Sequence, residues 1–320
     1  MHKDWRVYNN NGRKVEEKKI MRVAVVGAGF VGEATGRGIG KHNNHIVFLD
    51  TDAEKVKKLQ EAGFEAHVAS EYNEINTDVT MFSVPTPTKG KNIRLEYLEG
   101  ALTAFAERLK NHDKYHVAVI RSTVPPGTTR DIVLPIIEKV SGKKAGKDFG
   151  LVMQPEYLRE VTAAEDFERP WFVLIGEFDK RSGEVIEKIY RPFDSPIEHC
   201  SLEEAEMQKY VHNVYNAVKI AFFNEIRVAM EGKGLDAEKV FLATAQSCEG
   251  IWNPIYGLRN FGPFDGSCLP KDTRALLEWS EKEGFQFGIL KSVVKENLRH
   301  EKILGKNKTV RVNYLSNIEV

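Results

Sequence analysis

The residue with the greatest potential for covalent chemistry is Cys268, in the stretch GPFDGSCLPKDTRAL (residues 262–276). Pro270 suits the first turn of a helix, so the sequence predicts that Cys268 lies just before or at a helix N-terminus. The unpaired N–H groups and the helix dipole at that position favour the nucleophilic thiolate over the thiol. Asp272 lies four residues further on, on the same face of the expected helix. Taken alone, a cysteine is more often a small buried apolar residue than a nucleophile, and this setting makes the two interpretations about equal, so other residues must decide between them.

Two further pairs have the spacing of one helical turn. Glu156 and Glu160, in QPEYLREVTA, follow an expected strand at the sheet edge where ligands bind, and Lys209 and Asn213 share one face of a long expected helix. Thr123, in RSTVPPGTT, also follows a strand at that edge. Taken alone, each has a simpler interpretation: a solvated glutamate pair, a surface lysine and an ordinary loop.

A glycine-rich turn near the start of the chain predicts a dinucleotide site. Gly27, Gly29 and Gly32 fit the pattern G-x-G-x-x-G between an expected strand and an expected helix, and Asp50 ends the next strand. The glycines permit a tight turn, close approach of the backbone to a diphosphate, and close packing of helix on strand. A carboxylate at position 50 accepts hydrogen bonds from ribose hydroxyls and repels a 2′-phosphate, which favours NAD over NADP. The alternative is a turn whose glycines serve packing only.

The elements that position these residues alternate between short apolar runs and helical segments. The runs MRVAVV, HIVFLD, VTMFSV, HVAVIRS, FGLVMQ and WFVLIG have the length of strands. This alternation predicts an α/β fold in which an N-terminal Rossmann domain, a doubly wound parallel sheet, precedes a long central helix and a small helical domain. The expected long helix runs from Leu202 to about Glu231 and is stopped by glycines. The expected boundaries are a polar extension at 1–20, the NAD-binding domain at 21–200, a central helical domain at 201–300 and a tail at 301–320.

Composition excludes several classes of protein. The 320 residues carry 46 Lys and Arg against 46 Asp and Glu, so no overall charge attracts nucleic acid or an anionic membrane surface. No apolar run approaches the length of a membrane span, and the N-terminus lacks the apolar core of a signal peptide. Three cysteines do not indicate a disulfide framework, and a reducing cytoplasm is the expected location. No metal site is expected. Met1 and Met21 are both possible starts.

Several blocks together resemble the UDP-glucose/GDP-mannose dehydrogenase family, whose members oxidise a nucleotide sugar to its uronic acid with NAD. The similar blocks occur in the family's order and cover about residues 21–280: VVGAGFVG, SVPTPT, RSTVPPGTT, PEYLRE, EAEMQKYVHNVYNAVKIAFFNEI and GSCLPKDTRAL. The resemblance implies two hydride transfers, with Cys268 forming first a thiohemiacetal and then a thioester that water hydrolyses.

The resemblance also implies roles for the other candidates. Lys209 and Asn213 would stabilise negative charge on the reacting oxygen. Asp272 would transfer protons through an ordered water, and Glu160 would help to activate the hydrolytic water. Glu156 and Thr123 match positions near the reacting centre. The implied cofactor residues are Gly27, Gly29, Phe30, Val31, Gly32, Asp50, Lys55, Thr86, Thr123 and Glu160. The implied substrate contacts are Glu156, Lys209, Asn213, Arg259 and Gly266.

Two departures from the family pattern leave alternatives open. The chain ends soon after VKENLRHEKIL, where the family's nucleotide-closing domain is expected to begin, and Asp265 stands where the family has glycine. Three hypotheses follow: a short-form enzyme acting on UDP-glucose or a related nucleotide sugar, the same chemistry on a different or smaller sugar, and a noncatalytic NAD-binding relic. The family's long helix forms a dimer core, so we expect a homodimer through that helix, although periodicity alone favours an intramolecular core.

Overall fold

The computed structural model describes residues 20–304 except 91, 255, 259–262 and 267, and it leaves the side chains of 92, 160 and 304 undescribed. The chain forms two compact units that divide between Val211 and His212. The long helix α7 (Leu202–Gly232) runs from one unit into the other.

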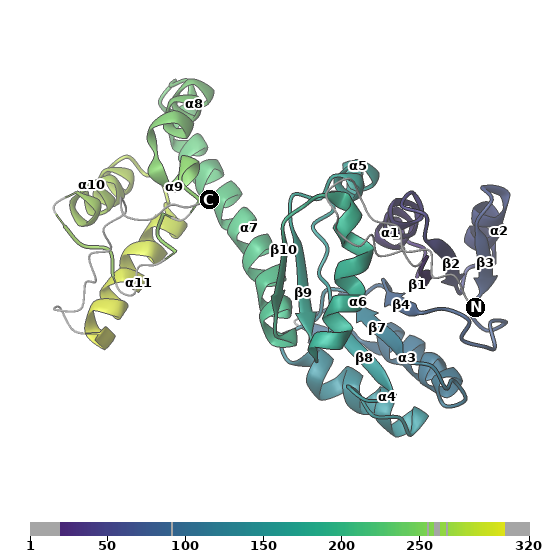
Figure 1. Ribbon diagram of the computed structural model, residues 1–320. Coiled ribbons are helices and arrows are strands. Elements are labelled where there is room, and N and C mark those ends of the chain that lie inside the picture. Colours follow the sequence, from purple (N-terminus) through teal and green to yellow (C-terminus); the bar gives the residue numbers. More distant parts are fainter. Residues whose placement is uncertain (1–19, 91, 255, 259–262, 267, 305–320) are drawn as a thin grey trace, which may run out of the picture. The chain divides into compact units, whose positions relative to one another are not determined.

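The first unit is built on an eight-stranded sheet with the order β10-β9-β8-β7-β4-β1-β2-β3. Figure 1 shows α3 and α4 on one face of this sheet, and α1, α5 and α6 on the other. The strands are β1 (Arg22–Val26), β2 (His45–Asp50), β3 (Glu65–Val68), β4 (Val79–Phe82), β7 (His116–Ile120), β8 (Phe149–Met153), β9 (Val173–Glu177) and β10 (Ile197–Cys200), and a separate hairpin pairs β5 (Thr88–Lys89) with β6 (Asn92–Ile93). The helices are α1 (Phe30–Gly40), α2 (Ala53–Glu61), α3 (Glu96–Leu109), α4 (Leu134–Ser141), α5 (Ala163–Glu168) and α6 (Lys180–Tyr190), with a π-helical turn at Thr129–Val133 and 3-10 turns at Glu160–Thr162 and Arg191–Phe193.

The central strands are apolar throughout because both faces of the sheet are covered. Every residue of β4, β7 and β8 is buried. Phe48 and Val25 pack in the core beneath α1, whereas Phe82 of β4 packs in a second core with Leu102 of α3. Continuous β-branched and aromatic runs, rather than alternating ones, are what a sheet with two covered faces requires. The predicted α/β Rossmann fold is confirmed.

One part of the sheet departs from the expected parallel arrangement. Strand β9 runs antiparallel to β8, and the two pair only through Val152–Glu177 and Met153–Gly176. Strand β10 pairs parallel with β9 and ends with Cys200 opposite Gly176. The end of β10 therefore lies level with the carboxyl end of β8, and α7 begins at the sheet edge where the loops after β7 and β8 emerge. Strands β3, β5, β6 and β10 were not anticipated because they are short or polar.

The described residues of the second unit contain the rest of α7 and the helices α8 (Ala237–Ser247), α9 (Glu249–Trp252), α10 (Leu269–Lys282) and α11 (Gly288–Leu304). Its small core is formed by Ala229, Phe287 and Leu290. The Glu225 carboxylate accepts hydrogen bonds from the N–H groups of Ile289 (2.9 Å) and Leu290 (3.3 Å), so α7 caps the start of α11.

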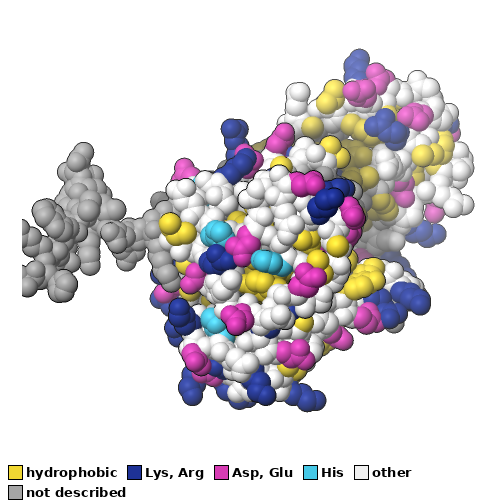
Figure 2. All heavy atoms as spheres, turned by 90° about the vertical axis from the view of Figure 1, so that its right-hand side faces the viewer, with side chains coloured by type: hydrophobic (Ala, Val, Ile, Leu, Met, Phe, Trp, Pro, Cys, Tyr) yellow, Lys and Arg dark blue, Asp and Glu magenta, His cyan; other side chains and the backbone are white. Residues whose placement is uncertain are grey.

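The surface agrees with the balanced composition. Figure 2 shows basic and acidic side chains interspersed on the face that includes the β3 edge, without a broad area of one sign. None of the helices in the described part of the chain is long and apolar enough to cross a membrane.

Candidate active site

The turn between β1 and α1 gives each glycine a different steric role. Gly27 has φ of +91°, and a Cβ there would lie 2.8 Å from the carbonyl oxygen of Ser83. A Cβ on Gly32 would lie 1.8 Å from the carbonyl oxygen of Gly27, so this glycine is needed for α1 to pack on β1. Gly29 is the N-cap of α1, and a Cβ there would meet no protein atom within 4 Å. The backbone at Gly29 thus faces open space at a helix N-terminus, which is the arrangement that a diphosphate requires.

Asp50 is held by the backbone around it. Asp50 is the last residue of β2 and is 8% exposed. Its Oδ2 accepts a hydrogen bond from Ala28 N–H at 2.6 Å. Its Oδ1 accepts another from Asp52 N–H at 2.9 Å. A carboxylate oxygen has two acceptor sites, so each Asp50 oxygen can still accept a hydrogen bond from a ligand. The same fixed negative charge disfavours a phosphate group at that place.

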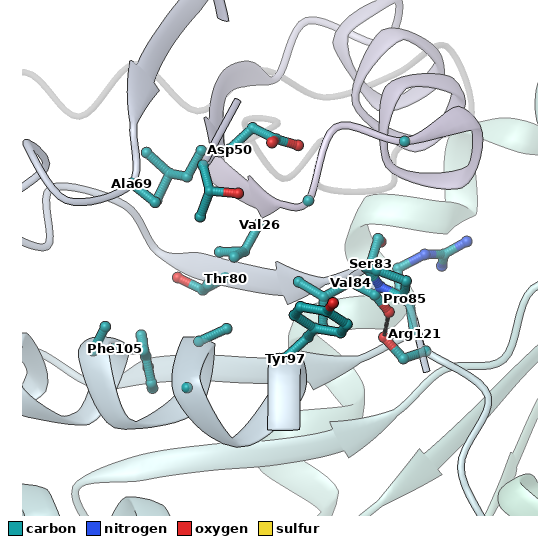
Figure 3. A pocket seen from close by; sticks show the side chains of 18 of the residues that line it. Val26, Asp50, Ala69, Thr80, Ser83, Val84, Pro85, Tyr97, Phe105 and Arg121 are labelled. Carbon is teal, nitrogen blue, oxygen red and sulfur yellow. Dashed lines mark hydrogen bonds between the residues drawn. The ribbon is translucent and has the colours of Figure 1, made fainter. Parts of the chain in front are cut away.

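The glycine turn and Asp50 open onto one pocket of about 770 Å³ along the carboxyl edge of the sheet. Its volume is within the usual range for small-molecule sites. In Figure 3, Asp50 lies on one side of the pocket and Tyr97 and Phe105 of α3 lie on the other, with Val26 and Thr80 of the sheet between them. The predicted site residues that line it are Gly27, Gly29, Phe30, Val31, Asp50, Lys55, Thr86, Thr123 and Glu156.

Hydrogen bonds between loops fix the part of the pocket that follows β4 and β7. The Thr86 hydroxyl donates to the carbonyl oxygen of Thr123 at 2.7 Å, and the Ser122 hydroxyl donates to the carbonyl oxygen of Val84 at 2.6 Å. The two loops are therefore tied to each other twice. Thr86 and Thr123, expected near the cofactor, lie side by side.

Lys209 lies in the second turn of α7 and is bonded to Glu156. Its Nζ lies 3.0 Å from Glu156 Oε1 and also donates to the Glu156 carbonyl oxygen, and the two side chains are 7% and 12% exposed. Glu156 Oε2 accepts from Leu158 N–H at 2.7 Å. The ammonium also lies 5.5 Å from the centre of the Tyr157 ring, and burial raises the pKa of that phenol above its usual value. The structure thus brings together two site residues that lie 53 positions apart.

The remaining candidates are Cys268, Asp272, Asn213 and Gly266 of the second unit, Glu160 of the first, and Arg259. Cys268 is the N-cap of α10 and is exposed, and its carbonyl oxygen accepts from Asp272 N–H at 2.8 Å within the first helical turn. Asn213 lies on α7, and Gly266 has φ of +94° in the loop before Cys268. The site expected at Arg259 lies outside the described residues. For Glu160 only the backbone, at the start of a 3-10 turn, is described.

Two buried residues near the pocket were not singled out from the sequence. Arg121 lines the pocket, is 2% exposed, and donates from its guanidinium to the Tyr190 hydroxyl at 2.8 Å. Glu206 is fully buried one turn before Lys209. Arg121 lies in the motif RSTVPPGTT and Glu206 in EAEMQKY, but the type of a charged residue does not reveal that it is buried.

The fold and pocket define a Rossmann-type dinucleotide-binding domain followed by a helical unit that starts with a long helix. The family model for the UDP-glucose/GDP-mannose dehydrogenase NAD-binding domain matches residues 21–71 and 62–194, and the model for that family's central domain matches residues 203–299. The chain therefore belongs to the UDP-glucose/GDP-mannose dehydrogenase family, and its cofactor is NAD.

Known proteins similar to the chain agree with this family. The chain is 34% identical over 298 residues to a GDP-mannose 6-dehydrogenase of Pseudomonas savastanoi pv. phaseolicola, covering 87% of this chain and 68% of the relative. It is 30% identical over 301 residues to a UDP-glucose 6-dehydrogenase of Haloferax volcanii, covering 87% and 69%. Among solved structures, a ternary complex of GDP-mannose dehydrogenase from Pseudomonas aeruginosa superposes with a TM-score of 0.83 at 31% identity, covering 90% of this chain and 72% of that one.

Proposed function

We propose that this protein oxidises the C6 hydroxymethyl group of a nucleotide sugar to a carboxylate in two NAD-dependent steps. The observation that carries the proposal is the pocket itself, in which Gly29 and Asp50 share one cavity with Thr123 and Glu156. Lys209, bonded to Glu156, adds a buried cation next to this wall. A turn whose glycines served packing only would not account for that buried cation.

When bound, NAD would accept one hydride from the sugar, and a second NAD would replace the NADH formed and accept the other, so each sugar consumes two NAD. Gly29 and the N-terminus of α1 bind and orient the diphosphate, and Asp50 accepts hydrogen bonds from the ribose. Lys209 carries three protons, of which two are directed at Glu156, so the third is available to stabilise negative charge on the C6 oxygen.

The second half of the reaction uses Cys268. Its thiolate adds to the carbon of the intermediate aldehyde to give a thiohemiacetal, whose oxidation leaves a thioester. Water then cleaves the C–S bond, which releases the sugar carboxylate and regenerates the thiol. Asn213 joins Lys209 in stabilising the oxyanion, Asp272 holds a proton close to the sulfur, and Glu160 activates the water.

Turnover of candidate sugars tests the proposal. GDP-mannose is the first to try because similar proteins at up to 34% identity carry that activity, and UDP-glucose is the second. NADH should form in a ratio of two per sugar consumed, with a uronic acid as the product. Binding of NAD without turnover of any nucleotide sugar or free sugar would instead identify a noncatalytic relic.

Replacement of Cys268 by serine tests the nucleophile. The variant should form no acid, because an alkoxide is far less available than a thiolate at neutral pH. Cys248→Ser is the matched control, since Cys248 is half-buried in the same unit and has no proposed role. Acid formation by the Cys268 variant at the wild-type rate would exclude the covalent route.

We further propose that the protein is a homodimer through α7. This helix exposes large apolar side chains at Val211, Val214, Tyr215, Val218, Ile220 and Val228, each more than 50% exposed. An apolar surface of this kind on one helix is typical of an interface. Light scattering after gel filtration should give twice the 36.3 kDa chain mass, and Val218→Glu should reduce it to one chain mass.

A further inference from the structure

Glu206 is a fully buried carboxylate that binds a distant loop. It lies in the second turn of α7 with no exposed surface. Its Oε2 accepts from Gly127 N–H at 2.5 Å, and its Oε1 accepts from Thr129 N–H at 2.7 Å. Both oxygens are thus used to fix the backbone of the segment that follows Pro125 and Pro126.

The fixed segment is the continuation of the Thr123 loop. Pro125 and Pro126 have no N–H groups to donate, so Gly127, with φ of +92°, supplies the first donor after the turn. Thr123, at the other end, lines the pocket and accepts the hydrogen bond from Thr86. The position of Thr123 therefore depends on how firmly this segment is held.

Stability alone is a poor reason for a carboxylate at this position. Burial raises the pKa of Glu206 even though hydrogen bonding by Thr129 and Gly127 lowers it, so these bonds do not fully offset the cost of burying the charge. Moving a charge out of water costs several kcal/mol, which its partners in the protein return only in part. The two directed hydrogen bonds, in contrast, specify the distance between α7 and the loop.

The same two turns of α7 also hold the second pocket loop. Gln208 Oε1 accepts from the Tyr157 hydroxyl at 2.5 Å, and Lys209 binds Glu156. Glu206 and Lys209 are three residues apart, which makes them neighbours on one helix face. This short segment of α7 is thus a common anchor for the loop carrying Thr123 and the loop carrying Glu156.

We propose that Glu206 is a positioning residue of the active site, which fixes Thr123 at a set distance from Lys209 by clamping the 123–129 loop to α7. The inference rests on the proposed function, because that function gives Lys209 and Thr123 their places beside the reacting sugar. Glu206 itself touches neither cofactor nor substrate. It acts through the two backbone groups that it binds.

The test compares Glu206→Gln with Glu203→Gln in the full-length protein. Glutamine keeps the size, but its amide can accept only one of the two hydrogen bonds and turns an NH2 group toward the other N–H. Glu203 lies on the same helix in an exposed ion pair with Arg130, so it controls for loss of charge. We expect Glu206→Gln to lower kcat about 10- to 100-fold. The NAD dissociation constant should remain close to wild type, because Gly29 and Asp50 lie on other elements. Tm should fall, because the buried N–H group left without an acceptor costs about 1–3 kcal/mol. Glu203→Gln should match wild type in all three.

Amide hydrogen exchange and a second variant make the test decisive. Exchange within residues 123–129 should become faster in Glu206→Gln, and Glu206→Asp, which keeps the charge on a shorter arm, should give an intermediate kcat. The aspartate variant replaces the glutamine variant if the latter does not fold. An unchanged kcat in a Glu206 variant of an active enzyme would overturn the inference and leave the proposed function standing. If wild type oxidises no sugar, the proposed function fails, and exchange alone decides whether the clamp exists: faster exchange supports it, and unchanged exchange overturns it.

Discussion

Substitution of Gly29 by alanine separates cofactor binding from folding more cleanly than any other change in the glycine turn. The added Cβ would meet no protein atom within 4 Å, and Gly29 has an ordinary φ of −73°. Alanine is a poorer N-cap than glycine, which lowers stability by roughly 0.5–1 kcal/mol. It also reduces the conformational entropy of the unfolded chain, which raises stability by about 0.4–1 kcal/mol. We therefore expect the free energy of unfolding to stay within about 1 kcal/mol of wild type.

The effect on NAD should be much larger. The added methyl group occupies the space that the diphosphate needs at the N-terminus of α1, and a hydrogen bond to a charged group contributes about 1.5–3 kcal/mol. Loss of one such bond corresponds to NAD binding that is roughly 10- to 100-fold weaker. Titration calorimetry with NAD and thermal unfolding without NAD measure the two quantities independently.

Two other alanine variants serve as controls, one for folding and one for NAD binding. At Gly32 the Cβ would lie 1.8 Å from a backbone oxygen, so Gly32→Ala should lower the Tm of the free protein strongly. At Gly40, the last residue of α1, the Cβ would meet only Ile46 Cγ1 at 3.3 Å, and this variant should bind NAD normally. Wild-type affinity for NAD in Gly29→Ala would show that the diphosphate does not bind at this helix end, and the site assignment would be wrong.

Three further outcomes follow from single residues. Asp50→Ser should weaken NAD and strengthen NADP, because it removes the charge that repels a 2′-phosphate; an unchanged ratio of the two dissociation constants would argue against ribose at Asp50. Burial lowers the pKa of His116 from 6.5 to about 3. Between these two pH values the unfolded chain binds a proton that the folded chain does not. The free energy of unfolding therefore falls as the pH falls, by about 1.4 kcal/mol per pH unit. Urea unfolding at pH 7 and pH 5 should show a smaller loss in His116→Gln, and equal losses would contradict a neutral buried histidine. Glu225→Ala should destabilise α11 by about 1 kcal/mol, seen as faster amide exchange at Leu290, and unchanged exchange would mean that the cap contributes little.

The sequence predicted the parts of the fold that depend on local patterns. Strands such as β4 and β7 are recognisable because buried parallel strands are apolar on both faces. The helix expected near Pro270 begins at Leu269, since proline in a first helical turn is a local signal. The antiparallel direction of β9 was not predictable, because an apolar run has the same composition in either direction. Strand β10, with Glu198 and His199 exposed, carries no such pattern.

The candidate site divides in the same way. Gly29 and Asp50 could be placed in one pocket because the glycine turn and the end of the next strand are neighbours in every parallel sheet of this order. The bond between Lys209 and Glu156, and the burial of Glu206, depend on how α7 docks against two loops. Such contacts join segments 50 to 80 positions apart, as in the pairs of Lys209 with Glu156 and of Glu206 with Gly127, and no local spacing encodes them. Their partners had to be seen in three dimensions.

Gly176 gives the fold an unexpected sensitivity. A Cβ at this position would lie 2.5 Å from Ala205 Cβ and 2.9 Å from the carbonyl oxygen of Ser201, so α7 approaches β9 as closely as a bare backbone allows. Even the smallest side chain would push away the start of the helix whose next turn carries Glu206 and Lys209. A residue with no functional group thus determines how accurately α7 places these polar groups. A substitution at Gly176 that inactivates the protein would do so by displacing Glu206 and Lys209, and not by removing a reacting group.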